Sequence, residues 1–104
     1  MRVILLCALG MSTSLLVENM KKAAKECGIE VNVEAHSVDQ FDKYLEEADV
    51  MLLGPQIRYK YRPLSKTAAA ANLPLAVIDT VAYGMVDGQK VLRQAMDLIK
   101  NKGN

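Results

Sequence analysis

The chain of 104 residues has no tryptophan, one phenylalanine and only two cysteines, and its charges almost cancel. Scarce aromatic side chains argue against a surface on which nucleic-acid bases stack, and a net charge of +1 argues against general binding to nucleic acid. Two cysteines are too few for a small domain held together by disulfides. We therefore expect free thiols in a reducing compartment.

Long hydrophobic runs are also missing. Met1-Arg2 leads directly into a short apolar run, so there is no signal-peptide core, and no apolar run approaches the ~20 residues that span a membrane. We therefore expect a cytoplasmic protein. The length suits a single domain over residues 1–104, and no linker, repeat or low-complexity segment divides it.

The most informative segment is the first apolar run together with the small residues that follow it. Residues 3–6 are aliphatic, as is typical of a buried parallel strand, and Cys7 ends this run. Gly10 permits backbone conformations that other residues resist, and the Ser-Thr-Ser of residues 12–14 is typical of a helix N-terminus. Cys7 is therefore predicted at the carboxyl end of a strand, where open α/β sheets bind ligands and where helix N-termini bind anions.

This position favours chemistry at the Cys7 sulfur. Loop N–H groups and a helix N-terminus stabilise a thiolate, and the same donors would hold the oxygens of a phosphoryl group bonded to the sulfur. The alternative is that Cys7 is a small buried hydrophobe at the end of a strand, which is common for free cysteine. The Gly-Met-Ser-Thr-Ser sequence that follows favours the chemical role.

Three motifs occur in order along the chain. They are Cys-Ala-Leu-Gly-Met-Ser-Thr-Ser at 7–14, Leu-Leu-Gly-Pro-Gln at 52–56, and Tyr-Gly-x-x-Asp-Gly at 83–88. Together they resemble the enzyme IIB component of the bacterial sugar phosphotransferase system, lactose/cellobiose type, and the likeness covers essentially the whole chain. The resemblance identifies Cys7 as the phosphorylated cysteine. It also implies a phosphate-binding loop made of Ala8, Leu9, Gly10, Met11, Ser12, Thr13 and Ser14.

The resemblance further implies an activity and a set of partners. Cys7 would accept a phosphoryl group from a phosphohistidine of the IIA component. It would pass that group to a β-linked disaccharide, similar to cellobiose or chitobiose, that enters through the membrane-embedded IIC component. The chain would thus be a phosphohistidine–sugar phosphotransferase with a phosphocysteine intermediate. It would be a cytoplasmic monomer without a cofactor or metal that meets the inner face of the membrane through IIC.

Two other classes of protein place a related sheet around a similar loop. Low-molecular-weight tyrosine phosphatases and arsenate reductases have a Cys, five residues, Arg and Ser, whereas Thr13 stands here in place of the arginine and Ser14 follows. The bidentate guanidinium that holds a transferring phosphoryl group is therefore missing. The third class is a non-enzymatic module. A flavodoxin-like cofactor binder is disfavoured by the lack of loop aromatics, and a receiver domain by the lack of paired acidic residues after Leu6.

The hydrophobic pattern predicts an α/β fold. We expect a four-stranded parallel sheet in the order 2-1-3-4 with helices on both faces, a three-layer sandwich that resembles the low-molecular-weight tyrosine phosphatase fold. The strands are predicted at 3–6, 29–35, 50–53 and 75–78. The helices are predicted at 13–27, at 63–71 and from 88 onward, the last capped by Asp87. A further short helix, capped by Ser37 or Asp39, is predicted to end at Glu47.

Several single residues receive specific expectations. Cys27 is expected to pack at the end of the first helix, and His36 is expected in a surface loop without metal ligands around it. The basic segment 58–62 is either a solvated face or a docking surface for an anionic partner. Because parallel strands end at the same edge of a sheet, the loops after the third and fourth strands should face the partner proteins. The residues expected to do so are Gln56, Tyr59, Asp79 and Tyr83.

Overall fold

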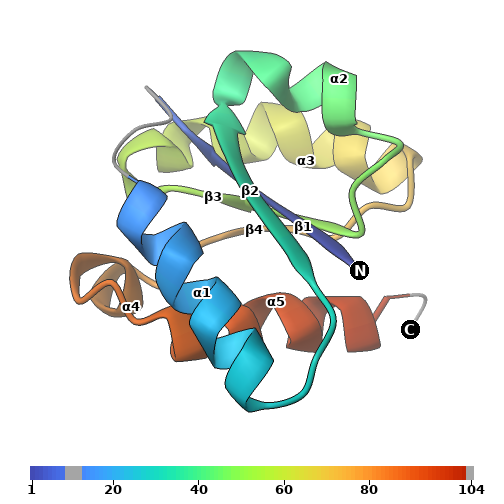
Figure 1. Ribbon diagram of the computed structural model, residues 1–104. Helices are drawn as coiled ribbons and strands as arrows, with labels where there is room; N and C mark the ends of the chain where they lie inside the picture. The colour runs from blue at the N-terminus through green and yellow to red at the C-terminus, as the bar shows by residue number, and fades with distance from the viewer. Residues whose placement is uncertain (9–12, 103–104) are drawn as a thin grey trace.

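A computed structural model describes residues 1–8 and 13–102, and within these ranges four parallel strands form one sheet in the order β2-β1-β3-β4 (Figure 1). The predicted strand order is confirmed. The strands are β1 (Arg2–Cys7), β2 (Asn32–Ser37), β3 (Val50–Leu53) and β4 (Leu75–Val77).

Helices cover both faces of the sheet. Figure 1 shows α1 and α5 on one face and α2 and α3 on the other, with α4 beyond the end of β4. The α-helices are α1 (Ser14–Glu26), α2 (Phe41–Tyr44), α3 (Tyr61–Ala70), α4 (Thr80–Gly84) and α5 (Gly88–Lys100). Two 3₁₀ helices, η1 (Val38–Gln40) and η2 (Pro55–Lys60), precede α2 and α3.

The central strand β1 divides the core into two hydrophobic clusters. Because successive side chains of a strand point to opposite faces, Val3 and Leu5 pack with α1 and α5, whereas Ile4 and Leu6 pack with α2 and α3. All four side chains are completely buried. Cys7 follows the same alternation and falls on the α1 side, at the carboxyl end of the strand.

Strand β2 begins three residues later and ends two residues later than predicted, so His36 is not in a loop. β2 pairs with β1 from Arg2↔Asn32 to Cys7↔Ser37, so residues 29–31 have no strand beside them although Ile29 and Val31 are partly buried. The alternation of apolar and polar residues at 29–31 therefore reflects packing against the core rather than pairing in the sheet. His36 lies within β2, opposite Leu6, and is half-buried.

The end of α1 also differs from the prediction, because Cys27 is exposed. Gly28 adopts φ +70°, which turns the chain back, and the Ile29 N–H donates to the Ala24 carbonyl at 2.9 Å. This hydrogen bond closes the C-terminus of α1. It places Ile29, rather than Cys27, against the hydrophobic cluster between the sheet and helices α1 and α5. Cys7 is buried and Cys27 is exposed.

Two helix boundaries differ from the sequence prediction, and one short helix was not predicted. Helix α2 ends at Tyr44 in a turn instead of at Glu47. Helix α3 begins at Tyr61, so Pro63 is its third residue rather than its first; this costs no hydrogen bond, since N–H groups of a first turn have no partner within the helix. Residues 80–84, expected as a loop, form the short helix α4.

Candidate functional site

The Cys7 sulfur lies at the junction of three chain segments. Its side chain is only 1% exposed, and its Sγ is 3.7 Å from Thr13 Oγ1. The thiol also donates a long hydrogen bond of 3.9 Å to the backbone carbonyl of His36 on β2. Thr13 itself is completely buried. The sulfur is thus held between β2 and the residue that precedes α1.

The start of α1 points its positive end toward this sulfur. Thr13 is the N-cap residue of α1, and its carbonyl accepts the first helical hydrogen bond from the Val17 N–H at 2.9 Å. The first turn of α1 contains no acidic residue that would offset the partial positive charge of the helix N-terminus. An anion on the Cys7 sulfur would therefore be stabilised by this end of the helix.

Gly54 brings the end of β3 close to Cys7. Its N–H donates to the Leu6 carbonyl at 2.8 Å, and a Cβ at this position would lie 3.7 Å from the Cys7 Cβ and 3.0 Å from Gln56 Oε1. Glycine thus leaves room for the Gln56 side chain beside the cysteine. Gln56 is exposed and Tyr59, one turn farther along η2, is 71% exposed.

Asp79 and Tyr83, the predicted partner-facing residues after β4, have structural roles at and around α4. Asp79 is exposed, and its Oδ2 accepts a hydrogen bond from the Ala82 N–H at 2.9 Å, as expected for a capping carboxylate. Its own N–H donates to Gln94 Oε1 at 3.1 Å. Tyr83 is half-buried and packs against the α1 and α5 cluster. Figure 1 places α4 at the same end of the sheet as the start of α1.

The predicted phosphate-binding loop is described only at its two ends. Ala8 is an exposed bend residue, and Ser14 is the exposed first residue of α1. Leu9, Gly10, Met11 and Ser12 lie outside the described residues.

The sequence reasoning missed the contribution of β2 to this site. The His36 ring stacks on the Tyr44 ring with centroids 4.3 Å apart, and His36 Nε2 lies 3.0 Å from Glu34 Oε1. Arg2 donates from Nε to Glu34 Oε2 at 2.6 Å. This network fixes the side chain of His36, whose carbonyl meets the Cys7 sulfur. This contact could have been inferred from the pairing of the first two strands, which places residues 36 and 37 beside Cys7.

The Arg2–Glu34 pair predicts a component of acid sensitivity. The hydrogen bond from Arg2 is the main reason that the pKa of Glu34 is lowered to about 2, against the opposing effect of burial. A lowered pKa stabilises the fold above pH about 4.5, where the unfolded carboxylate is ionised, and this contribution is lost as the pH falls toward 2. Glu34→Gln should therefore make the urea midpoint fall less steeply between about pH 5 and pH 3. Because the pair is partly exposed and screened by water, the effect should be small.

A matched control for this measurement is Glu30→Gln. Glu30 is an exposed carboxylate four residues earlier, and it forms no ion pair within the described ranges. The Glu30→Gln variant should follow the wild-type pH profile. Identical profiles for Glu34→Gln and the wild type would show that the pair has no thermodynamic effect.

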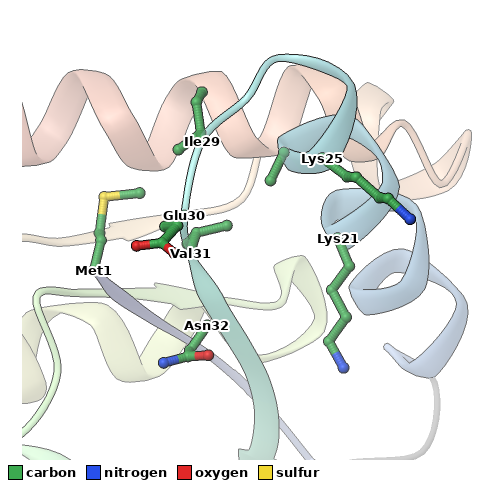
Figure 2. A pocket seen from close by; sticks show the side chains of 8 residues that line it. Met1, Lys21, Lys25, Ile29, Glu30, Val31 and Asn32 are labelled. Carbon is green, nitrogen blue, oxygen red and sulfur yellow. The ribbon is translucent and has the colours of Figure 1, made fainter.

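Other parts of the described structure offer no competing site. A hollow of about 480 Å³ lies between the end of α1 and the start of β2, opposite to the Cys7 end, and Figure 2 shows Lys21, Lys25, Glu30 and Asn32 among the residues around it. Residues 1–8 and 13–102 contain no cluster of three or more His, Cys, Asp or Glu side chains suited to a metal ion. No helix in these ranges combines the length and apolar character required to cross a bilayer.

Comparison with known sequences finds one family along most of the chain. The family described as PTS system, Lactose/Cellobiose specific IIB subunit matches residues 2–94. The chain is 41% identical over 101 residues to the oligo-β-mannoside-specific EIIB component of Bacillus subtilis strain 168, covering 97% of this chain and 98% of that protein. The galactose-specific and cellobiose-specific EIIB components of two Lactococcus lactis strains are 43% and 42% identical, each over 91% of this chain and 93% of the relative.

Solved structures give the same result. The cellobiose-specific phosphotransferase IIB component of Borrelia burgdorferi superposes with a TM-score of 0.83 at 35% identity, over 98% of this chain and 94% of that one. A YwlE mutant of Bacillus subtilis superposes with a TM-score of 0.53 at 17% identity, over 96% and 94% of the two chains. The second likeness shows the fold alone, and it confirms the expected relation to the low-molecular-weight tyrosine phosphatase fold.

Proposed function

The chain belongs to the family of lactose/cellobiose-specific IIB subunits of the PTS system, and from this membership we propose that Cys7 is the residue that carries the phosphoryl group. As a sugar-specific EIIB component it is a transferase of that system. The observation that supports the assignment is the placement of the Cys7 sulfur at the end of the central strand, beside the first residues of α1.

The proposed reaction has two displacement steps. The Cys7 thiolate attacks the phosphorus of a phosphohistidine on the IIA component; an S–P bond forms as the N–P bond breaks, and the electron pair returns to the histidine ring. A sugar hydroxyl then attacks the same phosphorus and an O–P bond forms as the S–P bond breaks. The electron pair of the S–P bond returns to the sulfur as the thiolate, and the proton of the hydroxyl is released to solvent. Positioning supplies most of the catalysis in such transfers.

The groups around the sulfur match this chemistry. Backbone N–H groups of residues 8–14, with the positive end of α1, would hold the phosphoryl oxygens. The Thr13 hydroxyl, 3.7 Å from the sulfur, would donate a hydrogen bond to one of them. A phosphatase would place an arginine at this position, so we propose that the thiophosphate is held for a partner rather than hydrolysed.

A labelling experiment tests the proposal. Protein incubated with phosphoenolpyruvate, the general carriers of the system and a IIA component should gain one phosphoryl group, located by mass spectrometry on the peptide that contains Cys7. The label should persist without an acceptor, and p-nitrophenyl phosphate should be hydrolysed negligibly. Rapid turnover of p-nitrophenyl phosphate through Cys7 would instead identify a phosphatase.

The proposed class of sugar is drawn from the sugars for which the relatives are named. Relatives named for oligo-β-mannoside, galactose and cellobiose are similar to the chain to nearly the same degree, 41–43% identity. We propose a β-linked disaccharide such as cellobiose or chitobiose, delivered by the membrane-embedded IIC component. We also propose that Gln56, Tyr59, Asp79 and Tyr83 face the partner proteins, since they follow β3 and β4 at the Cys7 end of the sheet.

A further inference from the structure

Positive charge is concentrated in one continuous part of the chain. Residues 50–78 contain four Lys or Arg residues and no Asp or Glu, whereas the rest of the chain contains nine basic and twelve acidic residues. The net charge of +1 therefore conceals a strongly cationic segment within an otherwise acidic protein. The four cations are Arg58, Lys60, Arg62 and Lys66.

These cations lie on η2 and α3 together with two accessible tyrosines. Arg62 and Lys66 are exposed and four residues apart, so they share one side of α3. Tyr59 is 71% exposed and Tyr61 is 38% exposed, and Lys60 Nζ lies 5.9 Å from the centroid of the Tyr59 ring. We call the basic residues Arg58, Lys60, Arg62 and Lys66, together with Tyr61, the cationic face. Arg58, Arg62 and Lys66 are exposed and Lys60 is half-buried, whereas Tyr59 remains among the residues proposed to face the partner proteins.

No carboxylate neutralises the cationic face within the part of the chain that the structure describes. The ion pairs found there involve Arg2, Lys21 and His36, and none of the four cations of the cationic face. Its four cations are therefore not held by ion pairs and can meet an external anion, and their field is reduced by salt and by the exposed Asp42 of α2 on the same face of the sheet.

The cationic face begins at the Cys7 end of the sheet, on the face that α2 and α3 cover. Helix η2 begins directly after Gly54, which adjoins Cys7 and Gln56. On the opposite face of the sheet, α1 carries the exposed side chain of Leu15. Beyond the end of β4, Val81 of α4 and Met85, the residue that follows α4, are exposed as well. Lysine is depleted at the centres of protein interfaces and apolar groups are enriched there. The exposed apolar residues of α1 and α4 therefore favour that side for a protein partner, and Lys60 and Lys66 disfavour the cationic face.

We propose that the cationic face binds the anionic headgroups of a phospholipid bilayer and thereby holds the Cys7 end of the sheet close to the membrane. The functional part of this inference depends on the proposed function, in which the acceptor sugar enters through a membrane protein. Lysine, arginine and tyrosine are the side chains that favour the boundary between water and an anionic bilayer. Each cation near such a surface strengthens adsorption about fivefold, so four give weak, reversible binding. Reversible contact suits a carrier that must also meet a donor away from the membrane.

The test measures binding of the purified chain to vesicles by flotation. Vesicles of phosphatidylcholine with about one third phosphatidylglycerol should bind the protein at low salt, and vesicles of phosphatidylcholine alone should not. Binding should disappear at about 1 M salt, where the Debye length is about 3 Å. Arg62→Gln combined with Lys66→Gln should weaken binding at least tenfold, because two of the four cations are lost.

The matched control is Lys21→Gln combined with Lys25→Gln. These lysines are also exposed and four residues apart, but they extend from α1 at the other end of the molecule (Figure 2). Their loss changes the net charge equally and should alter vesicle binding less than twofold. Equal losses in the two double variants would overturn the proposal, since binding would then follow net charge alone.

Phosphorylation by a soluble IIA component separates this inference from the proposed function. The Arg62→Gln, Lys66→Gln variant should be phosphorylated at the wild-type rate. If it binds vesicles normally but is phosphorylated slowly, the cationic face docks an acidic protein and the proposal is wrong. If the wild-type chain is phosphorylated normally but does not bind anionic vesicles, the proposed membrane contact is wrong and the proposed function is unaffected. Vesicle binding without phosphorylation of Cys7 would instead contradict the proposed function.

Discussion

Replacement of Cys7 by serine should abolish phosphoryl acceptance from the IIA component. A serine hydroxyl is hardly ionised near neutral pH, so the Cys7→Ser variant lacks the nucleophile although the side chain is nearly the same size. Losing the attacking group of a covalent mechanism costs several orders of magnitude, and we expect labelling at least about 10³-fold slower than in the wild type. The measurement is the initial rate of phosphoryl transfer from a phosphorylated IIA component.

Cys27→Ser provides the control within the same chain. Cys27 is a free and exposed thiol at the far end of α1, so it is more accessible to reagents than the buried Cys7. The Cys27→Ser variant should be labelled at the wild-type rate and should restore sugar uptake to a strain that lacks this component. Label that remains in Cys7→Ser but vanishes in Cys27→Ser would reverse the assignment.

The arrangement of the sheet could be predicted largely because the patterns of three of its four strands report their surroundings; β4 is apolar throughout although it lies at an edge. Residues 3–6 and 50–53 are continuously apolar, and they form the two inner strands, which are buried on both faces. Residues 31–35 alternate, and they belong largely to the edge strand β2. The position of Cys7 at the end of β1 follows from the same pattern, since the apolar run stops there.

The surroundings of Cys7 could be predicted only in part. The motifs at 7–14 and 52–56 indicated that Thr13 and Gly54 lie near Cys7, because both segments end strands or begin helices at one edge of the sheet. The His36 carbonyl could not be placed without the register of β2, and a single surface histidine carries no signal for a backbone contact. Likewise, Cys27 continues the apolar spacing of α1. The chain turns at Gly28, however, so Cys27 is exposed instead of packed against the core.

The third motif of the resemblance has a structural explanation. In Tyr-Gly-x-x-Asp-Gly, Asp87 Oδ1 accepts a hydrogen bond from the Lys90 N–H at 3.1 Å and so caps α5. Gly88, the first residue of α5, lies against the backbone of α1. A Cβ there would be 2.3 Å from the Asn19 carbonyl carbon and 2.4 Å from the Met20 nitrogen. The motif thus sets how closely the two helices on this face approach each other.

Gly88→Ala should accordingly be among the most destabilising small substitutions in the chain. Backbone atoms of α1 cannot turn aside as a flexible side chain would, so the two helices must separate, and we expect a loss of about 3 kcal/mol in the free energy of unfolding. This outweighs the gain of at most about 1 kcal/mol that alanine brings to a helix. Separation would also strain the hydrogen bond of 2.8 Å that Asn19 Nδ2 donates to the Val86 carbonyl.

Gly84→Ala is the control, because it makes the same chemical change at the last residue of α4. A Cβ at Gly84 meets nothing within 4 Å. Its urea midpoint should equal the wild-type midpoint or exceed it slightly, whereas the midpoint of Gly88→Ala should fall sharply with little change in m value. Because α1 begins beside the Cys7 sulfur, the Gly88→Ala variant should also be phosphorylated more slowly under conditions in which it remains folded. Wild-type stability in Gly88→Ala would mean that α1 and α5 do not approach each other as closely as this packing requires.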